Sequence, residues 1–131
     1  MSNNTLILYY SQSGNTEKLA NIIHAEIGGD IKRIDDEIDI TTYECIFIGT
    51  PNHMQTAAAP VLNYIKSTDL SGKTIIPFCT HGTGGLQNIA RDIEANCPNS
   101  TILKAFAIQD INIGTAPEKI KEWLIEINIL S

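Results

Sequence analysis

Six consecutive polar and glycine residues, Ser11-Gln12-Ser13-Gly14-Asn15-Thr16, lie between a short apolar run and a stretch of helical periodicity. Hydroxyl and amide side chains at a helix start add donors to the free backbone N–H groups and the dipole that attract an anion there. Gly14 lacks the Cβ that would keep a ligand away from the backbone. The loop contains no Lys or Arg. These features predict a phosphate site formed mainly by neutral donors.

A simpler interpretation of the same loop is a helix N-cap with a tight turn, because Ser, Asn and Thr often serve in that way. Capping needs one such residue, whereas this loop has several together with Gln12. The loop is not a Walker loop, since no Gly-Lys-[Ser/Thr] follows, and it lacks the Gly-x-Gly-x-x-Gly pattern of dinucleotide sites. We therefore favour the phosphate site.

The elements that position this loop are predicted by apolar runs that alternate with stretches of helical periodicity. Apolar runs that look buried on both faces are typical of parallel strands, and spacings of three and four indicate amphipathic helices. The expected strands are 6–10, 31–34, 45–49, 74–79 and 102–108. The expected helices run from residue 15 to the Gly28-Gly29 pair and over 57–65, 86–97 and 116–127. Thr115 and Glu118 have the spacing of a capping box before the last helix.

This alternation predicts one α/β domain over residues 1–131, a parallel sheet doubly wound with helices on both faces. Sheets of this kind bind ligands beyond the carboxyl ends of their strands. The loops after the first, third and fourth strands, 11–16, 50–56 and 80–85, are therefore expected to carry the function. The segment 36–42 is predicted as either a helix or a loop.

Residues 8–16, Leu-Tyr-Tyr-Ser-Gln-Ser-Gly-Asn-Thr, resemble the flavodoxin signature, an aromatic-x-[Ser/Thr]-x-x-Gly-x-Thr pattern that binds the phosphate of FMN in that family. Residues 43–51 are similar to the strand that enters the family's first flavin loop, and 72–82 to its fourth strand and second flavin loop. The resemblance implies FMN as cofactor and a flavodoxin-like five-stranded parallel sheet with strand order 2-1-3-4-5.

Transferred by position, the resemblance implies three sets of FMN-binding residues. The phosphate would be bound by Ser11, Gln12, Ser13, Gly14, Asn15 and Thr16. The ribityl chain and one side of the flavin ring would be flanked by Thr50, Pro51, Asn52, His53 and Met54. Another edge of the ring would meet Thr80, His81, Gly82 and Thr83.

The ring positions depart from the family pattern, in which Trp or Tyr usually stacks on the flavin. His53, Met54 and His81 offer less stacking area than an indole, so we expect weaker ring binding. A flexible peptide of the first flavin loop normally turns its carbonyl toward the protonated ring nitrogen, and Asn52 is expected to replace the usual Gly because Asn tolerates left-handed backbone. The two histidines are either plain polar lining, the simpler interpretation, or a proton relay or pH sensor.

Composition excludes several other functions. The formal net charge is −6, from nine basic and fifteen acidic residues, and an acidic surface disfavours nucleic acid and anionic membranes. No apolar run approaches the ~20 residues of a membrane-spanning helix, and no secretory signal precedes the first strand. Cys45, Cys79 and Cys97 match no metal or disulfide pattern, and Cys79 is expected to be a buried structural thiol. These features predict a cytoplasmic protein with reduced thiols and no metal.

Three functions are compatible with the sequence. The favoured one is a low-potential electron carrier between a reductase and an acceptor protein, whose basic docking surfaces the acidic charge would attract. The second is a small NAD(P)H-linked quinone or flavin reductase, which usually needs longer insertions than this chain has. The third is a flavodoxin-like module that binds no flavin. A phospho-receiver domain is excluded, because it needs an acidic cluster after the first strand, where this chain has Ser11-Gln12-Ser13.

Overall fold

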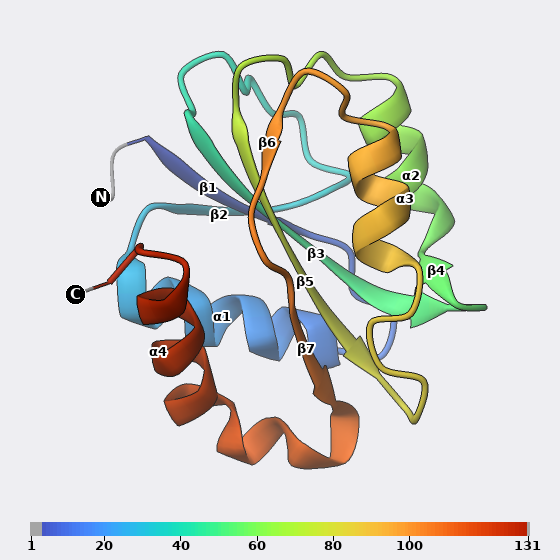
Figure 1. Ribbon diagram of the computed structural model, residues 1–131, viewed down its shortest axis with the longest axis vertical. Helices are drawn as coiled ribbons and strands as arrows, with labels where there is room; N and C mark the ends of the chain where they lie inside the picture. Colours follow the sequence, from blue (N-terminus) through green and yellow to red (C-terminus); the bar gives the residue numbers. More distant parts are fainter. Residues whose placement is uncertain (1–3, 131) are drawn as a thin grey trace.

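A twisted sheet with helices on both faces forms the centre of the computed structural model, which describes residues 4–130 (Figure 1). Its strands are β1 (Thr5–Tyr9), β2 (Asp30–Arg33), β3 (Cys45–His53), β4 (Thr56–Ala57), β5 (Thr74–His81), β6 (Thr101–Ile102) and β7 (Phe106–Gln109). The order is β2-β1-β3-β5-β6, with β7 also paired to β5, and all these pairs are parallel. Since β6 and β7 together take the place of the expected fifth strand, the predicted order 2-1-3-4-5 is confirmed.

Two separate apolar cores lie on the two faces of the sheet, because successive strand residues point to opposite sides. Leu6 and Leu8 of β1 pack on the side of α2 (Ala59–Lys66) and α3 (Ile89–Ala95). Ile7 packs on the side of α1 (Asn15–Ile27) and α4 (Ala116–Glu126), and Figure 1 shows these helix pairs on opposite faces. Burial on both faces explains why β1, β3 and β5 read as almost continuous apolar runs.

The largest difference from expectation lies after the third strand. β3 continues to His53 and returns through β4, so an antiparallel hairpin replaces the loop expected at 50–56. The segment 36–42, left open between helix and loop, contains no helix. The helix expected over 86–97 is shortened to α3.

The expected fifth strand is interrupted at residues 103–105. The Trp123 indole Nε1 donates to the carbonyl oxygen of Lys104 at 2.8 Å. This contact joins the interrupted segment to α4.

The capping box predicted at Thr115 and Glu118 is wrong. Thr115 Oγ1 donates to the carbonyl of Asn112 at 2.7 Å, and no side chain caps α4. A 3-10 helix over Asp110–Thr115 leads directly into α4, and the Ala116 N–H donates to the carbonyl of Ile113. The preceding 3-10 turn therefore supplies an acceptor for the N–H group of Ala116, the first residue of α4. Across residues 4–130, no helix is both long and apolar enough to cross a membrane.

Candidate functional site

The three segments predicted to bind a ligand follow β1, β3 and β5, which are adjacent strands of the sheet. Parallel strands end at the same edge, so these segments come together at the carboxyl edge. Direct contacts join them. The Thr16 and Thr80 hydroxyls pair at 2.8 Å, and Asn52 Nδ2 donates to the carbonyl of Gly85 at 2.8 Å.

Ser11 organises the first loop. Its Oγ accepts hydrogen bonds from the N–H groups of Gly14, at 3.1 Å, and Glu17, at 3.2 Å. Gly14 precedes α1 with φ 98°, a left-handed conformation that favours glycine. In the described part of the chain, five backbone N–H groups of this loop have no acceptor: those of Ser11, Gln12, Ser13, Asn15 and Thr16. Ser11 Oγ thus satisfies the Glu17 N–H in the first turn of α1, although the N-cap residue itself is Gly14. A set of free donors remains beside it, as an anion site requires.

The hydroxyl groups of three buried threonines form hydrogen bonds beneath the loops of the site. Thr16 and Thr80 are 1% and 2% exposed, and their hydroxyl pair links the start of α1 to the end of β5. The Thr50 hydroxyl accepts from the Ala58 N–H at 2.9 Å and donates to the carbonyl of Pro51 at 2.8 Å. These bonds hold the loops in place, and direct contact of these threonines with a ligand stays a prediction.

The second segment is the β3–β4 hairpin, in which Asn52 pairs with Ala57 and His53 with Thr56. The two turn residues, Met54 and Gln55, have φ values of 52° and 78°. Positive φ at both turn positions is typical of a type I′ turn, which normally selects Asn and Gly. In this conformation the positive φ values lie two and three residues after Asn52, at Met54 and Gln55, and the role of Asn52 as the flexible peptide stays a prediction.

Asn52 instead connects the hairpin to the loop after β5. Its Nδ2 donates to the carbonyl of Gly85 at 2.8 Å and to Gln87 Oε1 at 2.9 Å, and its Oδ1 accepts from the Gln55 N–H at 3.0 Å. Both N–H donors of the amide are used within the protein. Asn52 therefore positions the two loops relative to each other.

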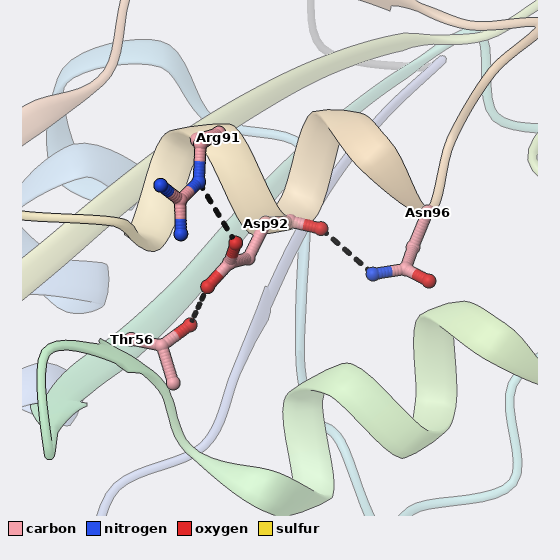
Figure 2. Close-up of polar contacts among 4 residues, drawn as sticks. All are labelled: Thr56, Arg91, Asp92 and Asn96. Carbon is pink, nitrogen blue, oxygen red and sulfur yellow. Dashed lines mark hydrogen bonds and ion pairs between the residues drawn. The ribbon is translucent and has the colours of Figure 1, made fainter.

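A second link joins the hairpin to α3, as Figure 2 shows. Thr56 Oγ1 donates to Asp92 Oδ2 at 2.5 Å, and Arg91 Nε lies 3.2 Å from Asp92 Oδ1. Asn96 Nδ2 donates to the backbone carbonyl of Asp92 at 2.8 Å. The Thr56 hydrogen bond, followed by the Arg91 contacts, holds the pKa of Asp92 below its usual value. Asp92 was not among the predicted residues, because a single acid on the polar side of a helix gives no sequence signal.

The residues predicted to lie beside the flavin ring, His53, Met54 and His81, differ in their surroundings. The His53 imidazole packs edge-on against the Tyr10 ring, with centroids 6.3 Å apart and planes at 86°. Met54 is 96% exposed at the hairpin tip. Among the described residues, His81 Nδ1 and Asp110 Oδ1 are buried side-chain atoms without a hydrogen-bond partner. Buried polar atoms normally pair, so both are candidates for contact with a ligand.

Asp110 was missed by the sequence analysis, although a signal existed. It directly follows β7, and therefore obeys the same carboxyl-edge rule that selected the other loops. Gly82 and Thr83 are exposed in the loop after β5, where Gln109 Nε2 donates to the Gly82 carbonyl at 2.6 Å. The segments 11–16, 50–56 and 80–85 contain no Asp, Glu, Lys or Arg, so Asp110 brings a charge to the edge of an otherwise uncharged set of loops.

Cys79 is a buried structural thiol, as predicted. Burial, followed by the negative charge of Asp110, raises the pKa of Cys79 to about 12, and a thiol of this kind is a poor nucleophile at neutral pH. Burial likewise raises the pKa of Cys45 to about 11. Within residues 4–130, no group of three or more His, Cys, Asp and Glu side chains is placed to bind a metal ion.

Comparison with known proteins relates the chain to a family. A sequence model described as flavodoxin matches residues 35–127. A flavodoxin of Synechocystis sp. is 30% identical over 82 residues, which cover 55% of this chain and 48% of that protein, so the match spans about half the length of the relative.

Solved structures share the fold. A Bacteroides uniformis protein described as a flavoprotein superposes with a TM-score of 0.79 at 21% identity, covering 92% of this chain and 99% of that one. A Lactobacillus acidophilus flavoprotein in complex with FMN superposes with a TM-score of 0.71 at 21% identity, covering 93% and 99%.

Proposed function

Because the chain belongs to the flavodoxin family, we propose that it binds FMN and carries electrons between redox proteins in the cytoplasm. The observation that supports this most directly is the loop 11–16, with backbone donors that have no acceptor among the described residues. Gly14 takes a left-handed conformation directly before α1, in the same loop as these donors. A phosphate group has the charge and the acceptor oxygens that such a set of donors binds.

The residues present suit the phosphate of FMN better than its ring. Loop 11–16 suits the phosphate, and the hairpin with the loop after β5 suits the ribityl chain and ring, where the unpaired His81 Nδ1 is a further candidate contact. FMN, when bound, supplies one-electron redox chemistry. The chain itself binds and orients the ring and limits its contact with water. With His53 and Met54 at the ring positions, we expect the phosphate to contribute a large share of the affinity.

The charge distribution is relevant to the proposed partners, a reductase and an acceptor with basic docking surfaces. The net charge of −6 belongs to the rest of the chain, because the three site loops carry no charged side chain. This charge would attract basic partners at long range and would disfavour adding an electron to the flavin. We therefore expect the rate of association with a partner to fall as salt is raised.

An FMN titration followed by flavin fluorescence tests the proposal, with riboflavin as the ligand that lacks the phosphate. We expect FMN to bind more tightly than riboflavin. Ser13→Asp, which places a negative charge at the loop, should remove that preference, whereas Ser67→Asp, at the exposed end of α2, serves as the matched control and should keep it. Equal binding of the two flavins by the wild-type protein would contradict the phosphate site.

Redox measurements then separate the carrier from the alternatives. Stepwise anaerobic reduction should show two one-electron steps, and NADPH should be oxidised only when a reductase is added. Steady NADPH oxidation by the protein alone would favour a small reductase instead. If the protein binds neither flavin, it is a flavodoxin-like module in which loop 11–16 has only a structural role.

A further inference from the structure

The junction between the β3–β4 hairpin and the segment leading into α3 concentrates unusual backbone. Of the four non-glycine residues with positive φ in the part of the chain that the structure describes, three lie here: Met54, Gln55 and Gln87. Conformations of this kind are unfavourable for residues with a side chain and persist only where the surroundings hold them. The junction must therefore contain contacts that keep the hairpin in this shape.

Apolar packing does not hold the hairpin tip. The Met54 side chain is 96% exposed, and Gln55 and Gln87 are also exposed. Hydrogen bonds hold it instead. The Asn88 N–H donates to the carbonyl of Gln55 at 3.0 Å, beside the three bonds of the Asn52 amide described above.

The contact between Thr56 and Asp92 differs from the others because its acceptor is charged. Hydrogen bonds to an ionised carboxylate are stronger than neutral ones. Arg91, the other partner of this carboxylate, is 71% exposed, so its ion pair contributes little. Thr56 is thus the main partner through which Asp92 acts, and it lies in the strand that immediately follows the strained turn.

We propose that Thr56 and Asp92 are positioning residues, which lock the hairpin against α3 in the conformation that receives the flavin. This inference rests on the proposed function, since it assumes that FMN binds between the hairpin and the loop after β5. Without the lock, the hairpin is docked in only a fraction of the molecules. The observed affinity for FMN then falls in proportion to that fraction.

Four variants test the lock: Thr56→Val, which removes the hydroxyl, Thr56→Ser, which restores it, Asp92→Ala, and the Val/Ala double variant. Thr101→Val is the matched control, because Thr101 is exposed in β6 and remote from the hairpin in the sheet. Two quantities are measured. The first is hydrogen exchange of the Gln55 and Asn88 amides in protein without flavin, and the second is the dissociation constant for FMN.

We expect Thr56→Val and Asp92→Ala each to weaken FMN binding by roughly tenfold. The double variant should weaken it by about the same factor, because both substitutions remove the same hydrogen bond. Exchange at Gln55 and Asn88 should accelerate in these variants while the amides of β1 stay unchanged. Thr56→Ser and Thr101→Val should behave as wild type.

Unchanged exchange in Thr56→Val, or losses that add up in the double variant, would overturn the proposal. If Asp92→Ala destabilises the whole protein, its β1 amides will exchange faster. In that case the comparison of Thr56→Val with Thr56→Ser tests the proposal. If the wild-type protein binds no FMN, the proposed function is wrong and with it the lock's role toward flavin. The exchange data would still show whether Thr56 and Asp92 hold the hairpin, so the two failures are distinguishable.

Discussion

The buried hydroxyl pair of Thr16 and Thr80 allows a strong test of how the first and third loops are joined. The two side chains are almost fully buried and their oxygens lie 2.8 Å apart. Valine replaces the hydroxyl of threonine by a methyl group of similar size. Thr16→Val or Thr80→Val alone therefore leaves the remaining hydroxyl buried without a partner, whereas the double variant leaves no unpaired polar group at this position.

The expected magnitudes follow from the cost of an unpaired buried polar group, about 1–3 kcal/mol. Each single variant should lower the free energy of unfolding by about that amount. Val and Thr have similar helix propensities, so the position of Thr16 in α1 adds little. When both partners are replaced by apolar groups of the same shape the effect is close to neutral. The double variant should therefore be nearly as stable as wild type, a coupling of about 2 kcal/mol or more between the two sites.

Urea unfolding, followed by circular dichroism, gives the free energy of unfolding of the wild type, the two single variants and the double variant. An FMN titration of the double variant shows whether the hydroxyl pair also affects FMN binding. If the double variant is as stable as wild type but binds FMN less tightly, the hydroxyls contact the ligand as well as each other. Unchanged FMN affinity would make the pair purely structural. Single variants with wild-type stability, or a double variant that loses the sum of the two single effects, would refute the pairing.

Three further predictions follow from the same structure. Gly14→Ala should lower the free energy of unfolding by about 1–2 kcal/mol, because φ is 98° there and an L-residue is strained in that conformation. The added Cβ meets no atom within 4 Å, so the backbone conformation alone causes this loss. Urea unfolding measures the stability, and an FMN titration tests whether the loop still binds. The hydrogen bond to Asp30 raises the pKa of Tyr43 from 10.0 to about 12, so a spectrophotometric titration should show one tyrosine ionising near that pH. Since the pKa is raised in the folded state, the stabilising contribution is complete below pH 10 and is lost between pH 10 and 12, and Tyr43→Phe should flatten this part of the stability curve. The pKa values of Cys45 and Cys79, about 11 and about 12, predict slow reaction with Ellman's reagent at pH 8 in the native protein, and rapid labelling of either thiol would contradict their burial.

The sheet was predictable because its central strands are buried on both faces. Burial of that kind leaves an apolar run, such as Leu6–Tyr9 or Cys45–Ile48, that a sequence shows directly. The carboxyl-edge rule then placed the three loops together before any contact was known. Contacts such as that between Thr16 and Thr80, separated by 64 positions, are a consequence of that arrangement.

The hairpin was not predictable from local sequence. A two-residue turn is normally announced by Asn-Gly or Asp-Gly, whereas this chain has Met54-Gln55. Pro51, which usually argues against a strand, lies within β3 and pairs with Thr80 of β5. The break between β6 and β7 was not predicted either, and there the Lys104 carbonyl accepts from an indole 19 residues away. Each of these features depends on tertiary contacts that a local pattern does not contain.

The two ends of the site are held by different kinds of contact. The phosphate loop is tied to β5 by the hydroxyl pair inside the protein, whereas the hairpin tip is held by polar contacts such as the exposed Asn52–Gln87 bond. Hydrogen bonds near solvent open locally at a lower free energy than buried ones. The donors of loop 11–16 are therefore held more firmly than the tip of the hairpin. With an exposed Met54 in place of a stacked aromatic ring, a flavin without phosphate should bind far more weakly than FMN, and affinity should respond more to loop 11–16 than to Met54.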